Sequence, residues 1–126
     1  MEIYTSYFSK LKNKPEGLTA ISIARWSPTW TNQIKTYMKL APTTTLLLGF
    51  KNGHIDQSEY IIQYKRDTLY RTPVVKILED LKSLKEKEDV GIVLYCYEKP
   101  SEFCHRHLVA EHLTKCSNLI VRELEY

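Results

Sequence analysis

The stretch VGIVLYCY (residues 90–97) constrains the fold more than any other part of the chain. It is almost unbroken in its apolar character, as expected of a strand whose two faces are both buried in a parallel sheet. A helical pattern follows at 101–115 and a β-type run at 118–124. A strand, a helix and a strand in this order predict a parallel pair joined by a crossover helix. The chain is therefore expected to be an α/β protein.

The rest of the sequence fits the same class. Strands are predicted at 2–8, 18–25 and 44–50, and helices at 31–40, 56–70 and 72–84, with a turn at 12–17. Asp56 or Ser58 is expected to cap the second of these helices, and Thr72 the third. The order β-β-α-β-α-α-β-α-β predicts a three-layer α/β sandwich, with a mostly parallel sheet and helices on both of its faces.

Composition limits the other classes of protein. A length of 126 residues predicts one domain over 1–126, and a net charge of +3 does not by itself indicate a nucleic-acid-binding protein. No apolar run approaches the roughly 20 residues of a membrane span. Three cysteines without a repeating spacing do not suggest a disulfide framework. We expect a reduced, cytoplasmic protein with no membrane association.

The richest chemistry lies in YCYEKPSEFCHRHLVAEHL (95–113). This stretch runs from the carboxyl end of the predicted buried strand into the amino end of the next helix. Open α/β sheets bind ligands at that edge, and a helix amino terminus there favours anions. Cys104, His105 and Arg106 fall in or near the first helical turn. The sequence therefore predicts an anion-binding pocket at this turn.

Individual roles follow from residue type and position. Arg25 ends the predicted second strand at the same edge, so Arg25 and Arg106 together are expected to bind a phosphate or carboxylate. Glu98 is a candidate general base or a ligand for a sugar hydroxyl. Cys104 is a candidate nucleophile, because the helix dipole favours its thiolate, or else a wall of the pocket. We expect it to be the most reactive of the three thiols. His105 is the third catalytic candidate.

Metal and redox alternatives are less favoured by the spacing. The four best zinc ligands, Cys104, His107, His112 and Cys116, share one predicted helix and cannot surround a tetrahedral ion. We therefore expect no bound metal and no cofactor. A redox pair of Cys96 and Cys104 is disfavoured because the spacing is not Cys-x-x-Cys, and Cys96 is interpreted as a small buried strand residue.

LYCYEKPSEFCHRHLVAEHL resembles the C-terminal signature of a bacterial, archaeal and phage family, domain of unknown function 488 (DUF488). ISIARWSP (21–28) resembles its second block, although many members have Asp-Val-Arg where this chain has Ile23-Ala24-Arg25. LAP (40–42) and the tyrosines at 60–64 are similar as well. The resemblance implies an α/β fold and a pocket, names no reaction, and carries over six positions: Arg25, Cys96, Glu98, Cys104, His105 and Arg106.

Two functional hypotheses remain open at this point. The first is a pocket for an anionic small molecule, a nucleotide or a nucleotide-derived metabolite. This hypothesis leaves open whether the protein is also a small enzyme. Nine tyrosines suit the walls of such a cleft. The second is a non-catalytic phage or defence module that binds nucleic acid or a protein. Its nucleic-acid surface would combine three lysines and three aromatic residues: Lys10, Lys12, Lys14, Tyr4, Tyr7 and Phe8. Neither hypothesis fixes an oligomeric state.

Overall fold

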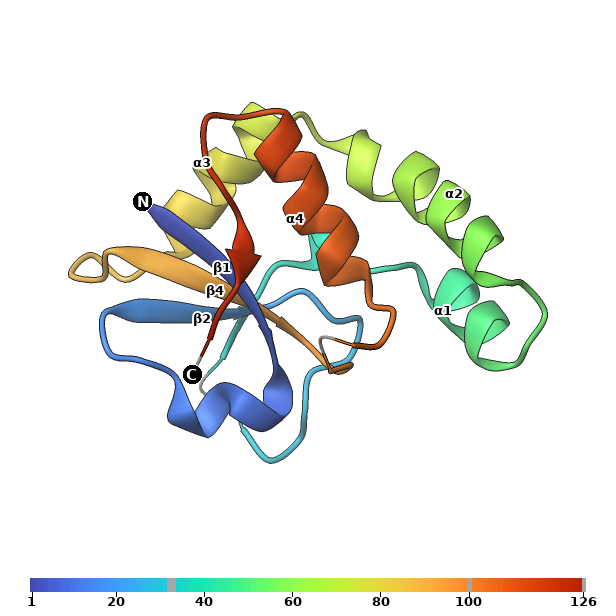
Figure 1. Ribbon diagram of the computed structural model, residues 1–126, viewed down its shortest axis with the longest axis horizontal. Coiled ribbons are helices and arrows are strands. Elements are labelled where there is room, and N and C mark those ends of the chain that lie inside the picture. The colour runs from blue at the N-terminus through green and yellow to red at the C-terminus, as the bar shows by residue number, and fades with distance from the viewer. Residues whose placement is uncertain (32–33, 100, 126) are drawn as a thin grey trace.

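A five-stranded parallel sheet forms the centre of the protein (Figure 1). The computed structural model describes residues 1–31, 34–99 and 101–125. The strands are β1 (Glu2–Tyr7), β2 (Leu18–Ser22), β3 (Lys35–Thr36), β4 (Gly91–Cys96) and β5 (Arg122–Glu123), in the spatial order β3-β2-β4-β1-β5. The predicted α/β sandwich with a mostly parallel sheet is confirmed.

The apolar run at 90–97 forms the middle strand, β4. All six of its residues are buried. It pairs with β1 from Glu2↔Gly91 to Tyr7↔Cys96, and with β2 from Leu18↔Gly91 to Ser22↔Tyr95. A central strand covered on both faces has no solvent side, which explains why the sequence does not alternate.

The two faces of the sheet are covered unequally. The helices α3 (Val74–Leu84) and α4 (His105–Lys115) both pack on one face, where Ile77, Leu81, Val109 and Leu113 join the main core. The opposite face is covered by the 3-10 helix η1 (Phe8–Asn13), whose Phe8 packs with Val93 and Tyr95. Figure 1 shows η1, in blue below the strands, on the side of the sheet opposite to α3 and α4. The second outer layer is therefore thinner than the first.

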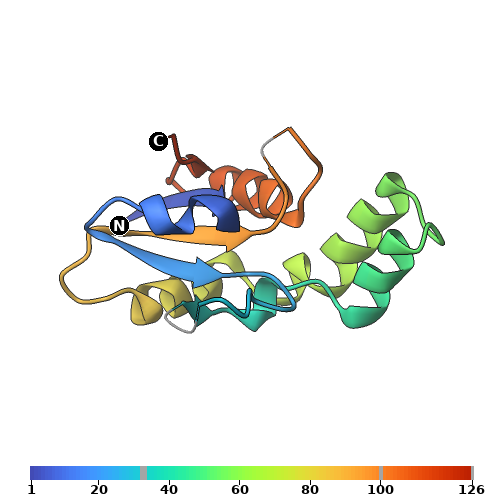
Figure 2. The ribbon, with the colours of Figure 1, turned by 90° about the horizontal axis from the view of Figure 1, so that it is seen from below.

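A helical hairpin projects beyond the carboxyl ends of the strands. It consists of α1 (Thr44–Lys51) and α2 (Gln57–Asp67), followed by the 3-10 helix η3 (Leu69–Arg71), and it is visible at the right of Figures 1 and 2. The predicted cap of α2 is confirmed, because the Asp56 side chain accepts a hydrogen bond from the Glu59 amide at 2.8 Å. Because the hairpin lies beyond the carboxyl ends of the strands, it is next to the sheet edge at which the ligand site was predicted.

The predicted strand at 44–50 is wrong, because these residues form α1. The Thr43 side chain accepts a hydrogen bond from the Leu46 amide at 3.1 Å and so caps the helix. Leu46 is buried but Leu48 is 43% exposed, which a strand buried on both faces would not allow. A short apolar run is compatible with either element, and here the threonine cap favours the helix.

The predicted helix at 31–40 is also wrong over its described part. Asn32 and Gln33 lie outside the described residues, and the regular elements in the rest are β3 and the 3-10 helix η2 (Met38–Leu40). β3 pairs with β2 through Ile21↔Lys35 and Ser22↔Thr36, where sheet hydrogen bonds replace helical ones. β3 is thus a strand of the sheet that was not predicted, and the segment 44–50 is not part of the sheet.

Several boundaries differ from the expected ones. Helix α3 begins at Val74 with Pro73 as its N-cap, so the expected cap at Thr72 is wrong. Helix α4 begins at His105 with Cys104 as its N-cap, and β2 ends at Ser22, three residues before Arg25. Within the described part of the chain, no helix is both long enough and apolar enough to cross a membrane.

The Tyr64 hydroxyl ties α2 to the core. Tyr64 is fully buried, and its hydroxyl donates to the Leu40 carbonyl at 2.6 Å. We expect Tyr64→Phe to lower the free energy of unfolding by about 1–2 kcal/mol, because the buried carbonyl loses its donor. Tyr70→Phe is the control, since Tyr70 is 57% exposed and its change is expected to stay within about 0.5 kcal/mol. Denaturant unfolding measures both variants, and equal losses would refute this role of the hydroxyl.

Candidate functional site

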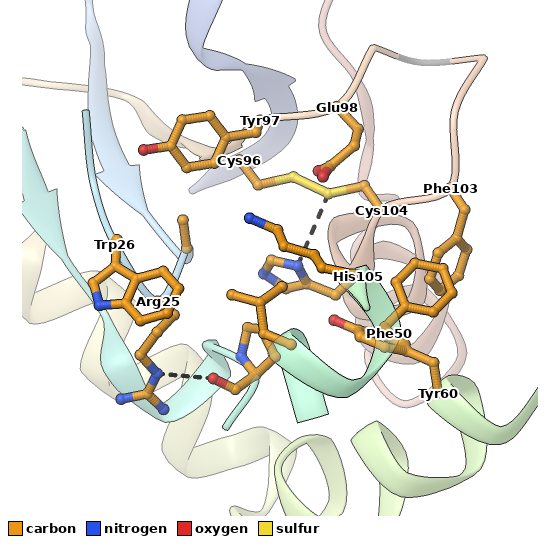
Figure 3. Close-up of a pocket in the computed structure, with 14 residues that line it drawn as sticks. Arg25, Trp26, Phe50, Tyr60, Cys96, Tyr97, Glu98, Phe103, Cys104 and His105 are labelled. Atoms are coloured by element: carbon orange, nitrogen blue, oxygen red, sulfur yellow. Dashed lines mark hydrogen bonds between the residues drawn. A yellow bond between two sulfur atoms is a disulfide. The ribbon is translucent and has the colours of Figure 1, made fainter. Parts of the chain in front are cut away.

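A pocket lies at the carboxyl ends of β2 and β4, beside the α1–α2 hairpin (Figure 3). Its walls come from the segment after β2, from α1 and α2, and from the turn between β4 and α4. Segments from separate parts of the chain therefore meet at one sheet edge, as expected for ligand sites of open α/β sheets.

One side of the pocket is formed by a sulfur pair. Cys96, at the end of β4, and Cys104, the N-cap of α4, are joined by a disulfide, and Cys116 is the one free cysteine among the described residues. The expectation that Cys96 and Cys104 would not pair is wrong. Their separation of eight residues is spanned by a turn that returns from the strand end to the helix start. Spacing along the chain therefore did not predict proximity in space.

His105 lies beside this bridge with a defined orientation. Its Nε2 lies 2.7 Å from the Ile23 carbonyl, and its Nδ1 lies 3.9 Å from the Cys104 sulfur (Figure 3). A carbonyl oxygen only accepts, so Nε2 carries the hydrogen and Nδ1 presents a lone pair to the sulfur. Burial lowers the pKa of His105 to about 4, against the opposing effect of the Ile23 hydrogen bond. The imidazole is therefore neutral at physiological pH.

Arg106 has a structural set of partners. Its side chain is fully buried, and its Nε and Nη2 each donate to Glu123 at 3.0 Å. Its Nη1 donates to the Cys96 sulfur at 3.1 Å and to the Glu98 carbonyl. Thr5 also donates to Glu123, at 2.7 Å, so the pair is embedded in the sheet. Arg106 is not among the residues that line the pocket.

Two cationic side chains do line the pocket, Arg25 and Lys51. Arg25 donates from Nε to the Pro42 carbonyl at 2.8 Å, which fixes the guanidinium and leaves its two Nη groups for a ligand (Figure 3). Among the described residues, neither Arg25 nor Lys51 forms a salt bridge within 4.0 Å. The lining thus holds two cationic side chains and one carboxylate, Glu98, so its formal charge is positive.

Aromatic rings and one carboxylate complete the walls. Trp26 and Tyr97 are about half exposed, whereas Phe50, Tyr60 and Phe103 form an inner cluster with ring centroids 5.0–5.7 Å apart. Glu98 points toward the bridge in Figure 3. Burial and the negative charge of Glu98 both raise the pKa of Tyr60, and both residues line the pocket.

The enclosed space is small. It measures about 80 Å³, against roughly 300–1,000 Å³ for sites that enclose a whole drug-sized ligand. The pocket therefore accommodates a small group, or one end of a larger molecule whose remainder stays at the mouth near Trp26 and Tyr97.

Comparison with known proteins adds one finding. The chain matches the family model DUF488-N3a, described as the active DUF488-N3 subclade, over residues 3–117. The chain belongs to the DUF488 family. No curated protein and no solved structure matches it significantly. The resemblance of its two sequence blocks to DUF488 is thereby confirmed.

Five of the six residues carried over from the DUF488 resemblance line the pocket: Arg25, Cys96, Glu98, Cys104 and His105. Arg25 lines the pocket and Arg106 does not, so the structure does not bring the two side chains together on one anion. A ligand role for Arg106 stays a prediction. Lys51 was missed because its helix was predicted as a strand. Trp26 and Tyr97 were missed although each directly adjoins a predicted site residue, and that adjacency was the available signal.

Among the described residues, the four predicted zinc ligands, Cys104, His107, His112 and Cys116, do not come together as one group. Cys104 lies at the start of α4, whereas Cys116 and His112 lie near its end, with the Cys116 sulfur 3.7 Å from His112 Nδ1. Among the described residues, the group of possible metal ligands that comes together is instead Cys96, Cys104 and His105.

Proposed function

We propose that the pocket of this DUF488 protein binds an anionic small molecule of the nucleotide class. The observation that carries the proposal is the pairing of two cations that form no salt bridge among the described residues, Arg25 and Lys51, with exposed aromatic rings at the carboxyl edge of the sheet. Cations bind phosphate, and aromatic rings stack on a planar base.

Arg25 is the main anion ligand in this proposal. Its guanidinium is held by the Pro42 carbonyl at 2.8 Å, so little side-chain freedom is lost when a phosphate binds. The remaining donors point as a planar fork, which matches two phosphate oxygens. Lys51, at the end of α1, adds a second positive charge.

The small volume fits a division of the ligand between two places. The inner space of about 80 Å³ takes the anionic group, and the base lies at the mouth against Trp26 or Tyr97. These rings are 49% and 51% exposed, so stacking would remove apolar surface from water. Glu98 then accepts a hydrogen bond from a ribose hydroxyl.

A chemical role for this site is a separate part of the proposal. Glu98 is the candidate acid–base group at the pocket wall. Cys104 is a nucleophile only after its bridge to Cys96 is reduced, because a disulfide sulfur carries no thiolate. His105 Nδ1 then stands 3.9 Å from the sulfur as a proton acceptor. Binding is therefore tested first, without assuming a reaction.

The test compares wild type with Arg25→Ala in binding of a nucleoside 5′-monophosphate, measured by calorimetry. We expect Arg25→Ala to weaken binding about 10- to 100-fold, because a charged hydrogen bond contributes about 1.5–3 kcal/mol. The matched control is Arg122→Ala. Arg122 is exposed on the edge strand β5 and does not line the pocket, so its removal should leave the affinity unchanged.

Tryptophan fluorescence reports the position of the base. Trp26 lines the pocket, whereas Trp30, which is 63% exposed, does not. Nucleotide binding is expected to quench the emission of Trp30→Phe but not that of Trp26→Phe. If Arg25→Ala and Arg122→Ala bind equally well, or if the quench follows Trp30, the proposed pocket is refuted.

Two of the residues predicted to form a nucleic-acid surface make contacts within the protein instead. Phe8 is 3% exposed and packs on Tyr95, so it does not present a face for base stacking. The Lys14 ammonium donates to the Pro15 and Leu18 carbonyls. Binding of single-stranded nucleic acid that falls steeply with salt, and that depends on Lys10 and Lys12 but not on Arg25, would favour that alternative.

A further inference from the structure

Three soft or borderline metal donors converge beside the pocket. The Cys96 sulfur, the Cys104 sulfur and a ring nitrogen of His105 all lie within 4.8 Å of one another, and all three residues are buried. Around a tetrahedral zinc ion, two sulfurs and a nitrogen would lie about 3.5–3.8 Å apart. The present distance of 3.9 Å between the Cys104 sulfur and His105 Nδ1 is already close to that value.

The backbone also leaves room for this arrangement. The Cα atoms of Cys96 and Cys104 are 7.5 Å apart, which is wider than the roughly 4.4–6.8 Å usual for a disulfide. The two sulfurs can therefore separate around an ion by side-chain rotation. One donor comes from a strand end and two from a helix start, so they approach the same point from different elements.

The groups behind the donors match those of a metal site. His105 Nε2 donates to the Ile23 carbonyl at 2.7 Å, which fixes the ring and directs the Nδ1 lone pair toward the sulfurs. Arg106 Nη1 donates to the Cys96 sulfur at 3.1 Å, so a second group orients this donor atom from behind. Arg106 is itself held by Glu123, so this donor is fixed in position.

We propose that Cys96, Cys104 and His105 bind one Zn²⁺ ion when the Cys96–Cys104 bridge is reduced. Reduction by a dithiol or a phosphine breaks the S–S bond and, with two electrons and two protons, gives two thiols. Zinc then displaces the two thiol protons, and the thiolates neutralise its charge. Two thiolates and an imidazole are the donor types that zinc selects.

The fourth position of such an ion would face the pocket, because all three donor residues line it. A zinc site with three protein ligands and an open position is characteristic of catalytic rather than structural zinc. At this open position the ion would hold a water molecule or an oxygen atom of a ligand. Glu98 lines the same pocket. The site stands on its own donors, and it does not depend on whether a nucleotide binds.

The first test compares the two redox states of the unmutated chain. Protein reduced with a phosphine and protein left oxidised are each incubated with zinc, desalted and analysed for metal. We expect about one equivalent in the reduced protein and almost none in the oxidised protein, since the bridge occupies both sulfurs. No substitution is involved, so a folding defect cannot explain the difference.

Variants then assign the ligands. In reduced protein, Cys96→Ser, Cys104→Ser and His105→Gln are each expected to weaken zinc binding about 100-fold or more in a chelator competition. Cys116→Ser is the matched control and should retain full affinity, because Cys116 lies at the other end of α4. Replacement of zinc by Co²⁺ should give the intense visible bands of a tetrahedral ion and a thiolate charge-transfer band.

Some results would overturn the proposal. They are a reduced protein with three titratable thiols and no retained zinc, equal zinc in both redox states, or loss of zinc on Cys116→Ser alone. An octahedral cobalt spectrum without thiolate bands would also exclude the assigned donors. Nucleotide binding can fail in the same preparation without affecting any of these readouts.

Discussion

Arg106→Ala is expected to lower the free energy of unfolding by about 3–5 kcal/mol, the usual loss when one partner of a buried ion pair is removed. The Arg106 side chain is fully buried, and it binds Glu123 through two hydrogen bonds of 3.0 Å. Its removal leaves the Glu123 carboxylate, which is 25% exposed, without a cation. It also strips donors from the Cys96 sulfur and the Glu98 carbonyl.

Two further variants make this prediction specific. Arg106→Lys keeps the charge but cannot form the bidentate pair, so an intermediate loss is expected. Arg66→Ala removes the exposed pair with Asp67, and such surface pairs contribute about 0–1 kcal/mol. Chemical denaturation of all three proteins is the measurement. A loss from Arg106→Ala no larger than that from Arg66→Ala would refute the structural role of Arg106.

Gly91→Ala is expected to lower the free energy of unfolding by about 2–3 kcal/mol, through overpacking against backbone. Gly91 opens the central strand and pairs with Glu2 of β1. A Cβ atom at this position would clash with the Glu2 carbonyl oxygen and would lie 2.8 Å from the Glu2 Cβ. Backbone cannot rotate away as a flexible side chain does, so the first pair of the β1–β4 ladder must open.

A second glycine provides a control of opposite sign. In Gly49→Ala, within α1, the added Cβ would meet nothing closer than Ile55 at 3.9 Å. Alanine is a better helix former, so this variant is expected to be more stable by about 0.5–1 kcal/mol. Thermal and denaturant unfolding measure the change in stability of both variants, with a loss expected for Gly91→Ala and a gain for Gly49→Ala. A Gly91→Ala protein as stable as wild type would contradict the close packing of β1 on β4.

The sequence predicted those elements whose patterns are set by burial or by capping. The run at 90–97 predicted the central strand because both of its faces are covered, and Asp56 predicted the start of α2. The run at 44–50 was assigned wrongly, because its apolar residues fit a strand or a helix equally well. Only the Thr43 side chain and the exposure of Leu48 decide between them.

The candidate site was predictable where its residues lie in one motif, and not where it depends on tertiary contacts. The strand-to-helix turn identified Glu98, Cys104 and His105, all of which line the pocket. The partner of Arg106 could not be read from the sequence, because Glu123 lies in a strand of two residues that pairs with β1. Lys51 became visible only once α1 was recognised as a helix.

The pocket at the carboxyl edge of the sheet is proposed to bind an anionic nucleotide-class molecule. The most direct test is a titration of ¹⁵N-labelled protein with a nucleoside 5′-monophosphate, followed by amide chemical shifts. Saturable shifts are predicted at residues that line the pocket, in the segments 24–26, 47–51, 96–98 and 103–105, and they should be lost in Arg25→Ala. Shifts confined to residues 4–14, or no saturable shift in the four pocket segments, would contradict the account.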